Sequence, residues 1–213
     1  MIEFRKIQRV LVLAPHTDDG EFGCGGTIAK LTENNADVYY AAFSACEQSV
    51  LPQFPKDILV TEVKSATQKL DIKPSNLILY DYEVRTFGYR RQEILENLIK
   101  LRKEIDPQLI FMPSLNDIHQ DHFTIAQEGL RAFKFSNILC YEVPWNNLTF
   151  NTICFSVLED SHLDKKAKAL AEYKSQAHRG YANEEFIRSL ARMRGVQINE
   201  SYCEAFDILR FLF

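Results

Sequence analysis

The sequence of 213 residues predicts an α/β fold, a three-layer Rossmann-like sandwich with a mostly parallel sheet and helices on both faces. Two observations lead to this prediction. Short apolar runs alternate with amphipathic helical stretches along the chain. The first run, residues 9–15 (RVLVLAP), is apolar along nearly its whole length, as expected for a strand buried on both faces of a parallel sheet. A βαβα order of this kind brings right-handed crossovers and a layer of helices on each side.

The first two-thirds of the chain supply the core of this arrangement. Strands are predicted at residues 9–15, 37–44, 76–82, 109–113 and 138–143, and helices at 21–34, 58–70, 89–105 and 121–133. The helix at 89–105 has the clearest pattern, because Ile94, Leu95, Leu98 and Leu101 recur at helical spacing among charged residues. The glycine-rich Gly23-Cys24-Gly25-Gly26 opens the first helix.

The last third has a different pattern. It predicts a strand over 150–157, helices over 161–177 and 183–194, and a β-like segment over 205–213. No linker rich in Pro, Gly or Ser and no internal repeat divides the chain, so we expect one domain over 1–213. In this interpretation, residues from about 145 to 213 could shape the substrate site.

Composition excludes several classes of protein. A net charge of −4 argues against binding to nucleic acid through bulk electrostatics. The opening residues have no signal-peptide pattern, and no apolar run reaches the roughly 20 residues that a transmembrane helix needs. The five cysteines are widely spaced without a C-x-x-C pair, which indicates free thiols in the cytoplasm. Assembly into a homo-oligomer is left open.

The first cluster with chemical potential is Pro15-His16-Thr17-Asp18-Asp19-Gly20-Glu21, between the first strand and the first helix. Ligands of open α/β sheets gather at the carboxyl ends of the strands, where this loop lies. An alternative is that Asp18 or Asp19 only caps the helix and that His16 is an ordinary loop residue.

The second cluster, Asn116-Asp117-Ile118-His119-Gln120-Asp121-His122, follows the fourth strand. Taken alone, Asp121 could cap a helix. Taken together, the two loops hold three of the chain's five histidines at equivalent ends of two strands. Two imidazoles and one carboxylate form a typical ligand set for catalytic zinc, with a fourth position left to water. The remaining carboxylates would then orient ligands and transfer protons.

These segments carry a family resemblance. Ala14-Pro15-His16-Thr17-Asp18-Asp19, followed by Gly23-Cys24-Gly25-Gly26-Thr27-Ile28, resembles the opening signature of the LmbE-like, or PIG-L, N-deacetylases. His119-Gln120-Asp121-His122 is similar to the second signature of that family, and Tyr173-Lys174-Ser175-Gln176 extends the likeness more weakly. The resemblance implies a zinc-dependent hydrolase that removes the acetyl group from an N-acetylated sugar or sugar conjugate.

Carried over residue by residue, the resemblance makes His16, Asp19 and His122 the metal ligands and Asp18 the general base. His119 would stabilise the oxyanion or protonate the leaving amine, with Asp121 as its supporting carboxylate. The sequence departs from the family pattern in two places. His-Pro-Asp-Asp-Glu becomes His-Thr-Asp-Asp-Gly, which displaces the glutamate to Glu21, and Leu59 stands where many members have an arginine.

Three further residues are candidates for substrate binding. Arg85 could hold a sugar hydroxyl or phosphate, or form a surface ion pair. Trp145 could stack on a sugar ring, or pack at a loop junction. His178 could reach the mouth of the site.

Two other functions are left open by the sequence. One is a metal-dependent hydrolase of another amide or an ester. The other is a non-catalytic sugar- or nucleotide-binding module, although Gly23-x-Gly25-Gly26 lacks the G-x-G-x-x-G spacing of dinucleotide loops.

Overall fold

The computed structural model describes residues 7–212, and its strands form one seven-stranded sheet in the order β3-β2-β1-β4-β5-β7-β6. The first five strands pair in parallel, whereas β7 is antiparallel to both of its neighbours. The strands are β1 (Arg9–His16), β2 (Asp37–Ser44), β3 (Leu77–Leu79), β4 (Leu109–Pro113), β5 (Asn137–Tyr141), β6 (Cys154–Leu158) and β7 (Tyr202–Arg210). Residues 1–6, for which the sequence predicts no signal peptide, and Phe213, the end of a predicted strand, lie outside the described residues.

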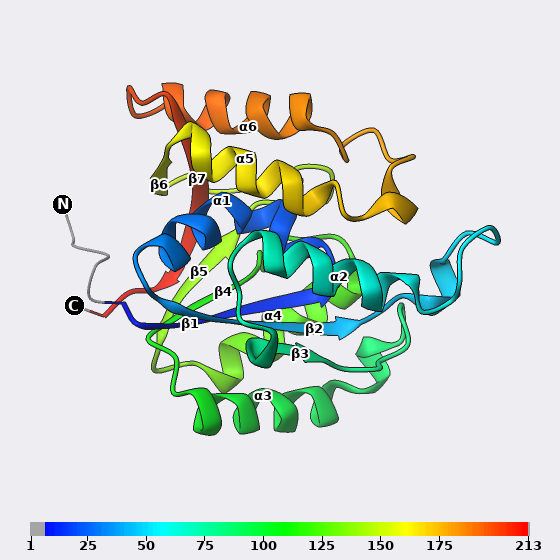
Figure 1. The fold of residues 1–213 in the computed structure, drawn as a ribbon. Helices are drawn as coiled ribbons and strands as arrows, with labels where there is room; N and C mark the ends of the chain where they lie inside the picture. Colours follow the sequence, from blue (N-terminus) through cyan, green and yellow to red (C-terminus); the bar gives the residue numbers. More distant parts are fainter. Residues whose placement is uncertain (1–6, 213) are drawn as a thin grey trace.

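Helices cover both faces of this sheet, as Figure 1 shows. One face carries α1 (Asp19–Glu33), α2 (Ile58–Lys69), α5 (Asp160–Leu170) and α6 (Glu184–Val196), and the other carries α3 (Arg91–Ile105) and α4 (Gln120–Ala132). Short 3-10 turns lie at Glu47–Ser49, Pro74–Asn76, Phe87–Tyr89 and Lys174–Gln176. The predicted three-layer α/β sandwich is therefore confirmed.

The position of β1 in the middle of the sheet, with helices on both faces, explains its apolar sequence. Side chains of successive residues in a strand point to opposite faces. Val10 and Val12 pack in the core beneath α1 and α2, while Leu11 and Leu13 pack in the core against α3 and α4. All four are fully buried. With β2 on one side and β4 on the other, β1 holds its carboxyl end near the middle of the sheet edge.

Several predicted elements are longer than the observed ones, among them one helix and one strand beside the sheet edge that carries the His/Asp loops. The helix expected over 161–177 ends at Leu170, because the following residues contact other parts of the protein instead of continuing the helix. There Tyr173 donates a hydrogen bond to the carbonyl of Thr17, and Ser175 donates to the carboxylate of Glu62. The strand expected over 76–82 is confined to Leu77–Leu79, and only this short segment pairs in register with β2.

The last third of the chain adds strands to the same sheet. The segment Tyr202–Arg210 returns between β5 and β6 and pairs with both. The β-like pattern predicted at 205–213 therefore forms a strand, although its start lies three residues earlier at Tyr202. That the whole chain is one domain stays a prediction.

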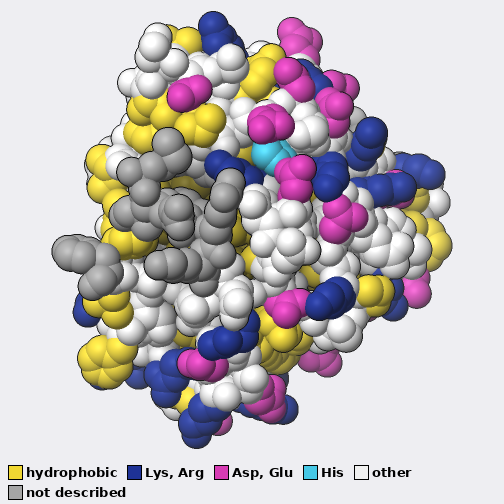
Figure 2. Space-filling view, turned by 60° about the vertical axis from the view of Figure 1, so that its left-hand side comes forward, with side chains coloured by type: hydrophobic (Ala, Val, Ile, Leu, Met, Phe, Trp, Pro, Cys, Tyr) yellow, Lys and Arg dark blue, Asp and Glu magenta, His cyan; other side chains and the backbone are white. Residues whose placement is uncertain are grey.

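The surface carries charges of both signs. In the face seen in Figure 2, Lys and Arg side chains are interspersed with Asp and Glu. Within residues 7–212, no helix combines the length and apolar character needed to cross a bilayer.

Candidate metal centre

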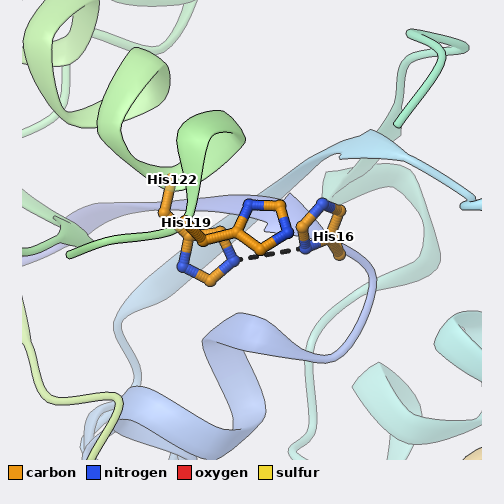
Figure 3. Close-up of side chains that lie close together, drawn as sticks. All are labelled: His16, His119 and His122. Carbon is orange, nitrogen blue, oxygen red and sulfur yellow. Dashed lines mark hydrogen bonds between the residues drawn. The ribbon is translucent and has the colours of Figure 1, made fainter. Parts of the chain in front are cut away.

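The two His/Asp loops meet because the strands that precede them are neighbours. His16 ends β1 and Asp19 begins α1, while His119 and His122 lie at the start of α4, which follows β4. Strands β1 and β4 pair in parallel, so both loops leave the sheet at the same edge. Figure 3 shows the three imidazoles facing one another across the gap between the β1 end and the α4 start.

Three side-chain atoms form a tight triangle at this point. His16 Nδ1 lies 3.2 Å from His122 Nε2, and Asp19 Oδ2 lies 3.2 Å from the former nitrogen and 3.1 Å from the latter. Ligands at about 2.0–2.1 Å from a tetrahedral zinc ion are separated by about 3.3 Å, so these spacings match three corners of such a site. The His16, His119 and His122 nitrogens also lie within 4.8 Å of one another and could hold a metal ion, in a wider arrangement.

Two buried carboxylates fix the orientation of the His16 and His122 rings. Asp121 Oδ2 lies 3.1 Å from His16 Nε2, and Asp117 Oδ2 lies 2.8 Å from His122 Nδ1. Each contact occupies the outer ring nitrogen and leaves the inner nitrogen directed at the triangle. Carboxylates in this position set the tautomer and raise the basicity of metal-binding imidazoles. Asp117 had no role in the sequence prediction, although its place in the His/Asp loop was visible.

The electrostatics of the centre favour a cation. Burial lowers the pKa of His122, but the Asp19 and Asp117 carboxylates outweigh it and raise that pKa to about 10. Burial also opposes the ionisation of Asp19. The charges of His122 and His16 outweigh this effect, so the pKa of Asp19 lies well below its usual range. The buried Asp121 Oδ1 has no hydrogen-bond partner among the described residues. The carboxylates that stabilise protons on the facing imidazoles would equally stabilise a divalent metal ion, which binds the neutral imidazoles in place of those protons.

Asp18 differs from its neighbour in having no side-chain partner. It occupies the N-cap of α1, yet its carboxylate makes no capping hydrogen bond. Burial raises its pKa to about 6, and the Asp19 charge adds to this effect, whereas His16 and Arg179 oppose it. The carboxylate lines the cavity instead of the helix end. The capping alternative for this aspartate does not describe the structure.

His119 caps α4 with its own ring. Its Nδ1 accepts a hydrogen bond from the backbone N–H of Asp121 at 3.2 Å, so a neutral ring carries its proton on Nε2. Burial and the charges of His16 and His122 lower the pKa of His119 to about 4. The expected partner carboxylate contacts a different ring: Asp121 reaches His119 through its backbone, while its side chain binds His16. This helix cap, an alternative that the sequence leaves open for Asp121, belongs to His119.

Glu21, the displaced glutamate, lies behind the loop. Its fully buried carboxyl group bonds the hydroxyls of Tyr40 and Tyr173, and both hydroxyls also lie within hydrogen-bond distance of the Thr17 carbonyl. Burial raises the pKa of Glu21 to about 8 against the effect of these hydrogen bonds. The cluster connects the His16–Asp19 loop to the segment after α5. Tyr40 and Tyr173 were not predicted, because nothing in the local sequence indicates this contact.

A cavity of about 330 Å³ opens above the centre. Its lining includes the His/Asp residues His16, Asp18, Asp19, His119 and His122 and a second wall formed by Arg85, Trp145, Gln176, Arg179 and Tyr181. Two of the predicted substrate residues thus reach the cavity. His178 does not line it; the residue is exposed and its ring contacts the carbonyl of Ser175, so the neighbouring Arg179 takes that place.

Fold and site together define an α/β protein with a metal-type ligand cluster at the carboxyl edge of its sheet. Residues 11–133 match the PIG-L family, described as GlcNAc-PI de-N-acetylase. Because the match spans more than half of the chain, the chain belongs to this family. The resemblance drawn from the two His/Asp segments is confirmed.

Relatives of known sequence include deacetylases. The chain is 24% identical over 178 residues to the uncharacterized deacetylase YaiS of Escherichia coli K12, covering 80% of this chain and 92% of the relative. It is 27% identical over 143 residues to diacetylchitobiose deacetylase of Thermococcus kodakarensis, covering 63% of this chain and 52% of that protein.

Solved structures share the fold. The conserved protein TT1542 from Thermus thermophilus superimposes with a TM-score of 0.80 at 21% identity, covering 97% of both chains. The 4-carboxy-2-hydroxymuconate hydratase GalB from Pseudomonas putida KT2440 superimposes with a TM-score of 0.75 at 16% identity, covering 97% of this chain and 98% of that one. The second likeness means that proteins with this fold catalyse more than one kind of reaction.

Proposed function

We propose that the chain is a zinc-dependent hydrolase that removes the acetyl group from an N-acetylated sugar. The observation that carries the proposal is the triangle of His16 Nδ1, Asp19 Oδ2 and His122 Nε2 at the floor of the cavity. Beside the triangle lie the Asp18 carboxylate, which has no side-chain partner among the described residues, and the His119 imidazole, whose Nε2 is available. Membership of a de-N-acetylase family and similarity to deacetylases support the choice of reaction.

His16, Asp19 and His122 would hold the zinc ion. Two imidazoles and one carboxylate with an open fourth position are typical of catalytic rather than structural zinc. Zinc bound here would supply Lewis-acid chemistry, lowering the pKa of water toward about 7 and polarising a carbonyl group. Asp121 and Asp117 hold the two ligand rings in position.

Asp18 acts as the general base in this proposal. An attacking water must lose a proton as its oxygen bonds to the acetyl carbon. The Asp18 carboxylate lines the cavity without a side-chain hydrogen-bond partner among the described residues, and a pKa of about 6 leaves it mostly ionised at neutral pH yet still basic. The proton that it takes can be returned to the amine nitrogen as the C–N bond breaks.

His119 stabilises the oxyanion in this proposal. Its Nδ1 accepts from the Asp121 backbone, so its Nε2–H is the available donor. A pKa of about 4 keeps the ring neutral at physiological pH, which favours hydrogen-bond donation to the oxyanion over proton delivery to the amine.

Arg85 and Trp145 are the proposed sugar contacts. Arg85 has a left-handed backbone, with φ of 70°, and its N–H donates to Asp121 Oδ2 at 2.7 Å, which ties this residue to the metal centre. Trp145 stacks on Tyr181 with ring centroids 3.7 Å apart, so one face of the indole is already covered. Trp145 therefore serves as a wall of the sugar site.

Two alternatives remain distinct from this proposal. Hydrolysis of another amide or an ester would use the same groups, and the hydratase of similar fold is a reminder that a fold does not fix a reaction. A non-catalytic binding module would have no use for an unpartnered Asp18 beside a ligand triangle. We further propose a cytoplasmic location, on the basis of five free cysteines, and leave a homo-oligomer open.

The test is release of acetate and free amine by zinc-loaded protein from a panel of acetamido sugars, nucleotide sugars, glycolipids and sugar-thiol conjugates. We expect turnover of at least one member. Turnover only of another amide or ester would make the substrate assignment wrong. Protein that purifies without a divalent metal and takes none up would favour the binding module.

A further inference from the structure

Arg179 is a charged residue of the cavity that the proposed reaction does not use. It lies in the segment between α5 and α6, is exposed, and lines the cavity on the wall formed by Trp145, Gln176 and Tyr181. Its guanidinium also lies over the ring of Tyr181, 5.8 Å from the centroid.

A chain of hydrogen bonds fixes the orientation of this guanidinium. Arg179 Nε donates to Gln176 Oε1 at 2.7 Å, and its Nη1 donates to the hydroxyl of Tyr181 at 2.9 Å. Gln176 is buried, and its Nε2 donates to Ser175 Oγ at 3.1 Å. Ser175 in turn donates through its backbone N–H and its hydroxyl to the buried carboxylate of Glu62, at 2.9 and 2.6 Å. The guanidinium is therefore held in place before any ligand binds, which reduces the entropy cost of binding.

Most of the hydrogen-bonding capacity of Arg179 is unused. A guanidinium has five N–H donors. Two of them are occupied, so three remain. Within residues 7–212, no carboxylate lies within ion-pair distance of Arg179, whereas the exposed Arg90 and the half-buried Arg188 both form ion pairs. A fixed guanidinium with a free edge is suited to bidentate binding of carboxylate or phosphate oxygens.

We propose that Arg179 binds an anionic substituent, a phosphate or a carboxylate, carried by the N-acetylated sugar. This inference rests on the proposed function for the identity of the sugar. Apart from the histidines of the candidate metal centre, the charged side chains that line the cavity are Asp18, Asp19, Arg85 and Arg179. The proposed reaction uses both aspartates, so the positive charge that faces the rest of the substrate comes from the two arginines.

Trp145 gives a measurement that does not depend on turnover. It is the only tryptophan in the chain, and it stacks on the tyrosine whose hydroxyl accepts from Arg179. Fluorescence titrations of zinc-loaded protein would compare N-acetylglucosamine with N-acetylglucosamine 6-phosphate and with N-acetylmuramic acid. The last two ligands distinguish phosphate from carboxylate.

We expect at least one anionic ligand to bind about tenfold or more tightly than the neutral sugar. Arg179→Gln should weaken binding of that ligand by about 10- to 100-fold, the effect of losing a charge-assisted hydrogen bond. The affinity of Arg179→Lys for this ligand should fall between those of the wild-type protein and Arg179→Gln, because lysine keeps the positive charge but cannot form the bidentate contact of a guanidinium. Arg90→Gln removes the same charge from the exposed Arg90–Glu93 pair and should leave the affinities within about twofold.

The proposal is wrong if wild-type protein shows no preference for either anionic ligand, or if Arg179→Gln and Arg179→Lys both keep the preference. Acetate release is measured in the same samples. A preference that depends on Arg179 without acetate from any sugar would support this site and contradict the proposed reaction. Acetate release without such a preference would support the reaction and contradict this site.

Discussion

Asp18 and Asp19 are adjacent in the sequence but have different surroundings. One oxygen of Asp19 is shared by His16 and His122, whereas the carboxylate of Asp18 lines the cavity without a side-chain partner. Their pKa values move in opposite directions, upward for Asp18 and downward for Asp19. Two identical side chains can therefore serve a proton-transfer role and a ligand role in one loop.

Exchanging each aspartate for asparagine separates these roles. Asp18→Asn keeps the shape of the side chain but cannot accept a proton at neutral pH, so we expect normal zinc content and a loss of about 10²–10⁴-fold in turnover. Asp19→Asn should lose zinc, because a neutral amide is a poor zinc ligand. Metal content and turnover would be measured for both variants, with exposed Asp81→Asn as the control. Zinc loss in Asp18→Asn together with zinc retention in Asp19→Asn would exchange the two assignments.

At this scale the sequence indicates only groups that are close along the chain. The three histidines and their aspartates could be recognised because each set occupies one short loop. Arg179 and Tyr173 reach the same region through a segment whose path depends on contacts with Glu62, Glu21 and Thr17. No local pattern predicts those contacts, so the sequence alone does not show that Arg179, and not His178, lines the cavity.

Among the elements, α1 has an interruption that the sequence marks only as a run of glycines. Cys24 leaves helical geometry, with φ of −147° and ψ of 22°. The backbone N–H groups of Gly26 and Thr27 beyond it donate to the Glu204 carboxylate at 2.9 and 2.7 Å. Lys166 Nζ lies 2.7 Å from the same carboxylate. A strand at the far end of the chain thus caps the second half of the helix that begins at Asp19.

Removing the Glu204 carboxylate should destabilise the protein. Glu204→Ala leaves a buried ammonium without its partner, and breaking a buried ion pair in this way costs about 3–5 kcal/mol. Urea unfolding measures the change. Glu104→Ala provides a matched control, because its pair with Lys100 is exposed and its loss should stay within about 0.5 kcal/mol. A free energy of unfolding for Glu204→Ala as close to wild type as that of the control would contradict this role.

Elements with strong periodicity could be predicted from sequence, and those limited by tertiary contacts could not. The predicted helix at 89–105 is found at Arg91–Ile105, and its predicted inner residues are buried. The helix predicted to run to 177 ends at Leu170, because Tyr173 and Ser175 bond to residues from other elements. Propensity and periodicity do not contain that information.

At the scale of the whole molecule, the metal centre joins parts of the chain about one hundred residues apart. His16 and Asp19 come from the β1–α1 junction and His122 comes from α4. The three proposed ligands converge only when β1 and β4 lie side by side. A ligand that binds the folded protein and not the unfolded chain stabilises the fold.

Zinc should therefore raise the melting temperature. At a free concentration of about 100 times its Kd, zinc would stabilise the fold by about 2.7 kcal/mol. For a chain of this length that corresponds to an increase of roughly 5–10 °C in Tm. The measurement is thermal unfolding of metal-free protein with and without added zinc. In His122→Ala the increase should disappear, and an equal increase in this variant would contradict the assignment of His122 as a ligand.

The order of the parallel strands follows general rules for βαβ units, so the sandwich could be predicted from sequence alone. The position of β7 could not. Whether a returning strand joins an edge or inserts between two others depends on packing across the sheet, and Phe206 packs against Phe111 of β4 from its place between β5 and β6.

The insertion of β7 sets a condition on biosynthesis. A ribosome delivers residues 154–158 more than forty residues before residues 202–210, yet β6 joins the sheet only through β7. During that interval the outer side of β5 has no partner in its ladder, and an unpaired strand edge is a template for association with other chains. The nascent protein is therefore vulnerable to aggregation in the interval between the synthesis of β5 and that of β7, when most of its sheet already exists.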